Sequence, residues 1–401
     1  MAELGKPGGR MRILLLSDDR ADPSMGGAKV AYKLQAALGR LGHDCEVALR
    51  PNLGSRPHAE RLRLALAPWL AGRAARQLGR NRPFDVIDAA GAEGWRLHRA
   101  GGPPVVVRSH GLEHRYYQQL LADARAGLAR KPWSRRLWYP ATRLPQVAAS
   151  LRRAQRVIVL SQADRRFVVA RGWQPAANIE VIPHGVEASL CRVAPAPGAR
   201  RGGGMLFCGW WTTSKGVHYL ARAHALLLQN GWAIPLTLAG VAAPGAAWPR
   251  QQDQIRRAFA PASQPLLRLV PRVADEAAVF AHYASHDLLV CPSTSEGFGM
   301  VVIEALSQRL PVVCSRAAGA AELLRDGGEA LLVEPRDPAA LAVAIAQLWQ
   351  NPELRARLGQ AGHELARQLS WDQIAARTVS CYAAAVGGAA SAAAGRAHQA
   401  S

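Results

Sequence analysis

The sequence predicts an α/β protein made of two consecutive doubly wound domains. Short runs of leucine and β-branched residues alternate with helical patterns, which is typical of parallel sheets connected by helices. The alternation stops at Cys191–Gly204, a segment rich in proline and glycine that is typical of a linker, and then starts again. A length of 401 residues also exceeds one ordinary core and suits two domains of about 200 residues each.

The first half of the chain contains six predicted strands and a clear amphipathic helix. The helix runs from about Lys29 to Leu41 and carries Val30, Leu34 and Leu38 on one stripe, so we expect it to pack on the sheet. The predicted strands are Arg12–Ser17, Cys45–Leu49, Val86–Asp88, Val105–Arg108, Val157–Leu160 and Ile179–Ile182.

The second half repeats this pattern and then becomes helical. We expect an N-terminal domain over residues 1–190, a C-terminal domain over 191–370 and a disordered tail over 386–401, where Gly, Ala and Ser dominate. The predicted strands are Met205–Cys208, Leu236–Ala239, Leu266–Val270, Leu288–Cys291, Pro311–Cys314 and Ala330–Val333, followed by helices at about Pro338–Trp349, Pro352–Leu369 and Trp371–Ala384.

The composition excludes several classes of protein. A hydrophobic content of 49% argues against intrinsic disorder, and no apolar stretch is long enough to cross a membrane. The first ten residues lack the apolar core of a signal peptide, so we expect a cytoplasmic protein. The cysteines have no metal-binding or redox spacing and are interpreted as small buried side chains in a reducing compartment: Cys45, Cys191, Cys208, Cys291, Cys314 and Cys381.

The net charge of +21 is concentrated in the first half, which carries +16 over residues 1–190. Residues 124–163 contain no acidic side chain and mix arginine with amphipathic aromatics, a pattern that favours an anionic, partly apolar surface such as a membrane. An arginine-rich solvated face explains the same run. Signatures of nucleic-acid binding are missing. The run comprises Arg125, Arg130, Lys131, Arg135, Arg136, Arg143, Arg152, Arg153 and Arg156 with Trp133, Trp138 and Tyr139.

Two features at strand ends mark a candidate site in the first half. Gly26 and Gly27 follow the first strand and precede a helix, where a bare backbone lets a ligand approach the helix N-terminus; a plain helix start explains them equally well. His110 follows the strand Val105–Arg108 and is expected to face the crevice at the carboxyl ends of the strands, unless it is a structural loop histidine. His114 is expected at the surface.

Two features in the second half fit the binding of an anionic ligand. Gly209 follows a strand, and Lys215 stands at a helix start after three hydroxyl residues, where an ammonium group can neutralise a phosphate; a solvated lysine is the alternative. The run from Cys291 to Leu306 joins a strand to a helix through a glycine-bearing loop.

The Cys291–Leu306 run separates two carboxylates by eight residues. Glu296 is placed before the helix, facing the crevice or capping the helix, and Glu304 lies inside the helix, where it can bind a sugar diol. The amides of Gly299, Met300 and Val301 form the helix start, a site for an anion.

These motifs, in this order, resemble the retaining glycosyltransferases of family 4 (glycosyl transferases group 1), which have the GT-B fold. The resemblance covers roughly residues 11–385 and rests on Gly26-Gly27, His110-Gly111, Val181 to Val186, Gly209 with Lys215-Gly216, Glu296-x7-Glu304, Gly319-x-x-Glu322 and Asp326-Gly327.

The resemblance implies two Rossmann-like domains that face each other across a cleft. It implies that the second domain binds a nucleoside diphosphate sugar as co-substrate, with Lys215 on the diphosphate, Glu296 on the sugar and Glu304 on the ribose. It also implies that the first domain receives the acceptor and that the last helix, about 371–385, packs back on this domain. We expect His110 to be a catalytic residue, because at its strand end it can donate a hydrogen bond to a substrate hydroxyl.

The chain departs from the family pattern at several positions. Trp210 stands where similar enzymes carry an arginine that binds the diphosphate together with the lysine. Either Arg316 or Arg272 replaces that arginine, or the donor is bound more weakly than in similar enzymes. His184 replaces a commoner asparagine, and Arg309 replaces a glycine.

The sequence therefore predicts a metal-independent, retaining hexosyltransferase without a cofactor. We expect it to act on a glycan or lipid-linked acceptor at the inner face of the cytoplasmic membrane, in envelope polysaccharide or glycolipid biosynthesis. The sequence motif Asp18-Asp19 resembles a metal site only superficially and is interpreted as part of a loop. The alternatives are a GT-B sugar epimerase or phosphorylase and a catalytically silent nucleotide-sugar-binding scaffold.

Overall fold

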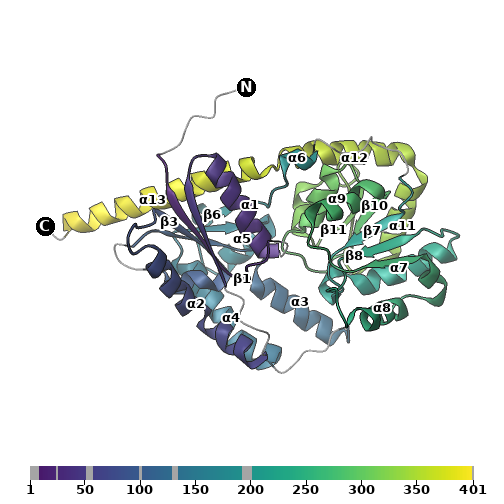
Figure 1. Cartoon of the computed structure of the whole chain (residues 1–401), viewed down its shortest axis with the longest axis horizontal. Helices are drawn as coiled ribbons and strands as arrows, with labels where there is room; N and C mark the ends of the chain where they lie inside the picture. The colour runs from purple at the N-terminus through teal and green to yellow at the C-terminus, as the bar shows by residue number, and fades with distance from the viewer. Residues whose placement is uncertain are drawn as a thin grey trace. The chain divides into compact units, whose positions relative to one another are not determined.

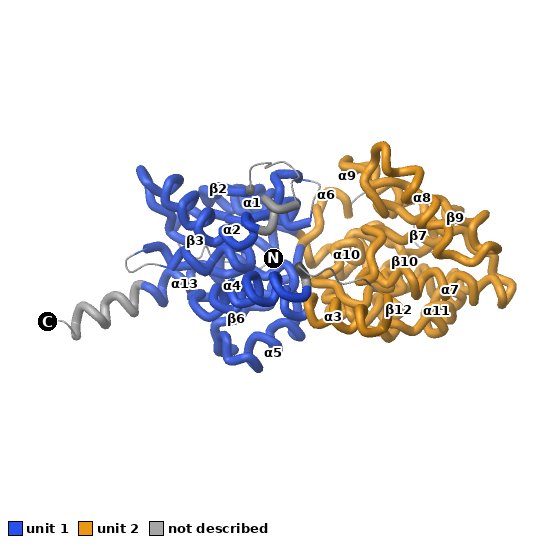
Figure 2. The backbone as a smooth tube through the Cα atoms, turned by 90° about the horizontal axis from the view of Figure 1, so that it is seen from below, with its two compact units in different colours: residues 1–115, 131–184, 371–401 blue, residues 116–130, 185–370 orange. Residues whose placement is uncertain are grey.

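The computed structural model describes residues 9–23, 26–50, 57–98, 102–128, 134–191 and 201–399. The chain divides into two compact units, coloured separately in Figure 2. Unit 1 comprises residues 1–115, 131–184 and 371–401, and unit 2 comprises residues 116–130 and 185–370. Each unit contains one six-stranded parallel sheet, so the prediction of a two-domain α/β fold is confirmed.

Unit 1 is built on a sheet with the strand order β2-β1-β3-β4-β5-β6, in which every neighbouring pair is parallel. Central strand β4 is valine-rich and fully buried, as expected for a parallel strand covered on both faces. The strands are β1 (Arg12–Arg20), β2 (Asp44–Arg50), β3 (Val86–Ala90), β4 (Val105–Arg108), β5 (Arg156–Val159) and β6 (Ile179–Val181).

Helices cover both faces of the first sheet. Figure 1 shows α1 and α13 on one side and α2 and α4 on the other. The helices of this unit are α1 (Gly26–Arg40), α2 (Pro57–Leu78), α4 (Tyr139–Arg153), α5 (Gln162–Ala170) and α13 (Trp371–Gln399), with shorter turns at η1 (Gly91–Arg96), η2 (Ser134–Trp138) and η3 (Ala176–Asn178); α3 (Glu113–Arg125) continues into unit 2.

A buried polar cluster fixes the last helix to the first sheet. Asp88 on β3 accepts hydrogen bonds from Arg108 on β4 at 2.8 Å and from the Tyr382 hydroxyl on α13 at 2.5 Å. All three side chains are nearly inaccessible to solvent. Helix α13 continues to Gln399 instead of ending near residue 385, which differs from the expected disordered tail; alanine, the strongest helix former, dominates this segment.

Unit 2 has the strand order β12-β11-β10-β7-β8-β9, again all parallel. Its strands are β7 (Met205–Cys208), β8 (Leu236–Ala239), β9 (Leu267–Val270), β10 (Leu288–Cys291), β11 (Val312–Ser315) and β12 (Leu331–Val333). Its helices are α6 (Ala188–Cys191), α7 (Val217–Gln229), α8 (Trp248–Arg257), α9 (Glu276–Ser285), α10 (Met300–Ser307), α11 (Pro338–Gln350) and α12 (Pro352–Arg367), with turns at η4 (Thr213–Lys215), η5 (Pro261–Leu266) and η6 (Gly319–Leu323).

Side-chain caps start several helices of unit 2. Asp275, Asp337 and Asn351 each accept hydrogen bonds from backbone amides of the first turn of α9, α11 and α12. Such caps are local signals, which explains why the boundaries of α11 and α12 agree closely with the sequence pattern.

Two expectations about loops need revision. Strand β1 extends to Arg20, so Asp18 and Asp19 belong to a strand end and not to a loop. Cys191 closes α6 instead of opening a linker, and residues 192–200 of the expected linker lie outside the described residues. No helix in the described ranges is both long enough and apolar enough to cross a membrane.

Candidate active site

In unit 2, Lys215 is held at the carboxyl end of β7 by a short glycine-framed turn. The chain leaves β7 at Gly209, forms the turn η4 and enters α7 through Gly216. Gly216 has φ +72°, and a Cβ there would lie 1.8 Å from the Pro292 carbonyl oxygen. Glycine is therefore required for both the left-handed backbone and the close approach of the loop that follows β10.

The loop after β10 carries Glu296 to the same point. The amides of Thr294 and Ser295 donate to the Ser214 carbonyl at 2.8 and 3.2 Å, which fastens this loop to the η4 turn. Glu296 then forms an ion pair with the Lys215 ammonium, although the two residues are far apart in sequence. The structure thus brings together the two charged residues that the sequence singled out.

The Lys215–Glu296 pair is partly shielded from solvent, with side-chain exposures of 26% and 16%. Burial alone lowers the pKa of Lys215, but the Glu296 carboxylate outweighs it, and the pKa ends above its ordinary value. The lysine is therefore a fixed positive charge at neutral pH. The Glu296 carboxylate balances this charge, so an anionic ligand has to compete with Glu296 for the ammonium.

Helix α10 begins immediately after this pair. Gly299 adopts φ +93° as its N-cap, and no side chain caps the helix, so the first-turn amides of Met300 and Val301 point out of the helix start. The motif Gly319-x-x-Glu322 requires its glycine for a packing reason. A Cβ on Gly319 would lie 2.2 Å from the Gly297 carbonyl oxygen, so only glycine lets η6 pack against the loop that carries Glu296.

Glu304 lies one turn inside α10 and is 6% exposed. The hydroxyl of buried Tyr283 donates to Glu304 Oε2 at 2.8 Å and fixes the orientation of the carboxylate. Tyr283, on α9, was missed by the sequence reasoning because nothing in its own segment indicates a partner in α10.

Trp210 occupies the position at which similar enzymes carry an arginine that binds the diphosphate. Trp210 is 39% exposed beside the Lys215 turn. Arg316, one proposed substitute, is bound to Asp326 at 3.0 Å and to Glu334 at 3.3 Å. Two carboxylates therefore already bind the Arg316 guanidinium group.

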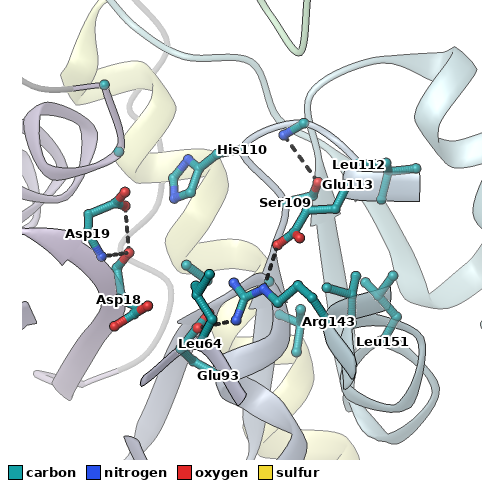
Figure 3. Close-up of a pocket in the computed structure, with 18 of the residues that line it drawn as sticks. Asp18, Asp19, Leu64, Glu93, Ser109, His110, Leu112, Glu113, Arg143 and Leu151 are labelled. Carbon is teal, nitrogen blue, oxygen red and sulfur yellow. Dashed lines mark hydrogen bonds and ion pairs between the residues drawn. The ribbon is translucent and has the colours of Figure 1, made fainter. Parts of the chain in front are cut away.

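Unit 1 contains a pocket of about 540 Å³ at the carboxyl ends of β1 and β4 (Figure 3). Gly26 and Gly27 line it at the start of α1. A Cβ on Gly27 would lie 2.0 Å from Asp19 Oδ2, so the glycine leaves room for this carboxylate. Asp19 accepts a hydrogen bond from the Ser17 hydroxyl at 2.6 Å.

His110 faces this pocket and packs against a second histidine. Its ring lies 5.6 Å from that of His184, which in turn lies 6.3 Å from Trp371. Burial lowers the pKa of both His110 and His184, so both rings are neutral at pH 7. The family departure at His184 therefore lies directly behind the candidate catalytic residue.

His114 is not at the surface as expected. It is half-buried, with its ring 4.6 Å from that of Trp173, and burial lowers its pKa to about 4.

The pocket wall is an ion-pair network that the sequence did not reveal. Arg143 donates to Glu93 at 2.8 Å and to Glu113 at 2.9 Å, as Figure 3 shows, and Arg63 pairs with Asp18. Arg143 and Glu93 are largely buried. The guanidinium groups of Arg63 and Arg143 are therefore already engaged by carboxylates.

The arginine–aromatic run at 124–163 is not a single face. Arg143 lies in the pocket wall, Arg152 lies 5.7 Å from the Trp173 ring, and Arg156 donates to the Ala177 carbonyl. Helical periodicity sends neighbouring arginines of α4 in different directions. Trp138 is exposed, whereas Arg130, Lys131 and Trp133 lie outside the described residues.

Among the residues that the structure describes, no three His, Cys, Asp or Glu side chains are grouped so that they could hold a metal ion.

The chain matches two family models. Residues 25–190 match Glycosyltransferase Family 4, and residues 203–351 match Glycosyl transferases group 1. These matches cover most of both units. Fold and sequence thus define a GT-B glycosyltransferase, and the chain belongs to the group 1, family 4 glycosyltransferases.

Relatives of the chain carry the name of a glycosyltransferase. The D-inositol 3-phosphate glycosyltransferase of Pseudarthrobacter chlorophenolicus is 29% identical over 326 residues, which is 77% of this chain and 74% of the relative. That of Geodermatophilus obscurus is 33% identical over 242 residues, 57% of this chain and 52% of the relative.

The similar solved structures share the fold at low identity. Sucrose-phosphate synthase from Thermosynechococcus elongatus has a TM-score of 0.74 and 22% identity, covering 92% of this chain and 98% of that one. Anabaena HepE, solved with UDP and glucose, has a TM-score of 0.64 and 20% identity, covering 92% and 100%.

Proposed function

We propose that this glycosyltransferase moves a hexose from a nucleoside diphosphate sugar to a hydroxyl of a glycan or lipid-linked acceptor, with retention of anomeric configuration and without a metal ion. We assign the reaction to envelope polysaccharide or glycolipid biosynthesis. The observation that carries the proposal is the Lys215–Glu296 ion pair at the start of α10.

This pair suits the departure of a diphosphate. Breaking the bond at the anomeric carbon makes an oxocarbenium-like centre and increases the negative charge on the leaving group, so catalysis requires fixed positive potential at the phosphate. Lys215 and the amides of Met300 and Val301 supply it without a metal ion. Glu296 accepts hydrogen bonds from hydroxyls of the donor sugar, and Glu304 accepts them from the ribose.

Retention follows if the departing phosphate takes the proton of the acceptor hydroxyl on the same face of the sugar. A double-displacement mechanism instead needs a carboxylate nucleophile with a second carboxylate about 5 Å away. Glu296 is held by the Lys215 ammonium, which favours a binding role over a nucleophilic one.

We assign the acceptor to the pocket of unit 1. His110 is neutral and can exchange hydrogen bonds with an acceptor hydroxyl. The relatives are named for inositol 3-phosphate, which makes a polyol phosphate one candidate. An uncharged sugar or polyol ring suits the pocket better, because the carboxylates that line it outnumber its arginines: Asp18, Asp19, Glu93 and Glu113 against Arg20, Arg63 and Arg143.

We place the enzyme at the anionic inner face of the cytoplasmic membrane as a peripheral protein. The net charge of +21 supports attraction to such a surface.

A thermal-shift screen with UDP, GDP, ADP and their sugars, followed by an assay of nucleotide release, tests the proposal. A bound nucleotide raises the unfolding midpoint by mass action, and release should require an acceptor. Exchange of the sugar C2 proton with solvent would indicate an epimerase, and release of sugar 1-phosphate on adding phosphate would indicate a phosphorylase. Tight binding without turnover on any acceptor would indicate a scaffold.

A further inference from the structure

Unit 1 contains a second hollow, of about 290 Å³, that shares no lining residue with the pocket of His110. It is formed by the exposed side of α2, the turn η1 and the end of α4. Its lining residues are Trp69, Gly72, Arg76, Trp95, Arg96, His98 and Arg153.

The hollow combines aromatic walls with unneutralised positive charge. The Arg96 guanidinium lies 4.6 Å from the Trp69 ring and 4.4 Å from the Trp95 ring, and the two rings meet edge to face at 5.3 Å. No carboxylate lines the hollow, and within the described part of the chain Arg76, Arg96 and Arg153 have no ion-pair partner. Convergent guanidinium groups without a carboxylate are suited to binding an anion.

His98 lies on the wall of the hollow beside the arginines. Its Nε2 atom is buried and has no hydrogen-bond partner among the described residues. Burial, reinforced by the charge of Arg153, lowers its pKa to about 4, so the ring is neutral at pH 7. The positive charge of the hollow therefore comes from its three arginines, and the neutral ring adds none.

The helix that forms one wall also exposes an apolar stripe. Leu62, Leu66, Trp69 and Leu70 of α2 are 60%, 42%, 44% and 49% exposed. At 100° per residue they fall within about 100° of the helix circumference, a single face. Arg73 and Arg76 continue this face towards the hollow, and residues 62–80 contain no acidic side chain.

We propose that this face of unit 1 docks on an anionic lipid membrane, with the α2 stripe at the headgroup boundary and the hollow holding the phosphate of a lipid headgroup. The inference rests on the membrane association proposed above and gives it a site. An exposed apolar stripe alone fits a protein partner equally well. The adjacent arginine hollow, which lacks any carboxylate, favours a surface of phosphates.

The experiment is co-sedimentation of the full chain with vesicles of phosphatidylcholine alone or mixed with phosphatidylglycerol. Wild-type protein should bind the anionic vesicles and bind less at high salt, because the attraction decays within a Debye length. The double variant R76Q/R153Q should bind about thirtyfold more weakly, the effect of removing two basic side chains from an anionic surface. The variant L66S/L70S should also lose binding.

Matched controls come from unit 2. R250Q/R257Q on α8 removes two exposed arginines, and V343S removes an apolar side chain that is 68% exposed. Both should bind like wild type. Unfolding midpoints of all variants identify any that fail to fold, and for such a variant the single substitutions R76Q and R153Q replace the double one.

Three outcomes would overturn the inference. Anionic-vesicle binding that survives R76Q/R153Q and L66S/L70S would place the membrane contact elsewhere. Stabilisation by dissolved inorganic phosphate, lost in R76Q/R153Q while vesicle binding is unchanged, would identify a soluble phosphate ligand. A lipid-free dimer that L66S/L70S dissociates would identify a second copy as the partner. Nucleotide release by the wild-type protein without vesicles tests the transferase proposal separately.

Discussion

Replacing Lys215 should weaken nucleotide binding, whereas replacing Glu296 should not. Lys215→Ala removes the ammonium that meets the diphosphate. A charge-assisted hydrogen bond contributes about 2 kcal/mol, so nucleoside diphosphate affinity should fall about thirtyfold, and the transfer rate should fall with it. Glu296→Gln instead removes the carboxylate that competes with the phosphate for Lys215.

The size of the second effect follows from the exposure of the pair. With side chains 26% and 16% exposed, solvent screens the interaction, and we discount it to about 1 kcal/mol. Nucleotide affinity in Glu296→Gln should therefore stay constant or rise by up to about fivefold, while turnover falls at least tenfold because a contact with the sugar is lost in the transition state.

Isothermal titration with the diphosphate and a coupled assay of its release measure the two quantities, and the double variant closes a thermodynamic cycle. Arg222→Ala, an exposed change on α7, is the control. Weakening of nucleotide binding by Glu296→Gln as large as that by Lys215→Ala, or unchanged nucleotide affinity in Lys215→Ala, would contradict these roles.

Three further changes test other parts of the structure. Asp88→Asn should destabilise unit 1 by about 3–5 kcal/mol in chemical unfolding, because Arg108 keeps a buried charge without its partner; a loss below 1 kcal/mol would contradict this. His114→Phe should flatten the rise of the unfolding midpoint between pH 4 and 6.5. The pKa of His114 is about 4 in the folded protein, so between pH 4 and 6.5 this histidine takes up a proton only in the unfolded state. Stability is therefore lost as the pH falls through this window. An unchanged slope in His114→Phe would show that His114 is not the cause. Trp210→Arg restores a cation near the phosphates, so the affinity for a nucleoside diphosphate, measured by calorimetry, should rise about tenfold. Weaker binding would show that the tryptophan itself contributes to the site.

Local sequence patterns predicted much of the fold and of the unit 2 site. The strand–loop–helix pattern from Cys291 to Leu306 correctly placed Glu296 before a helix and Glu304 inside it, because the hydrophobic run and the glycines lie within one short segment. The same reasoning expected Lys215 at a helix start, and the structure has it there.

The unit 1 pocket shows why the remainder was not predictable. Arg143 stands in a run without acids, so it looked like a surface arginine, yet its partners Glu93 and Glu113 come from other elements of the sheet edge. Partners separated by 30 to 50 residues leave no local pattern. The exposed stripe of α2 was missed for a related reason, since exposure is decided by which face of the helix the sheet covers.

The most direct test of the proposed reaction is the anomeric configuration of its product. The full chain, with EDTA present, is incubated with an α-linked nucleoside diphosphate hexose that it binds and with a pool of glycan and lipid-linked acceptors, and the product is examined by proton NMR. We predict acceptor-dependent release of the diphosphate, an unchanged rate in EDTA and an α-linked product. A β-linked product, or transfer that stops when EDTA is added, would contradict it.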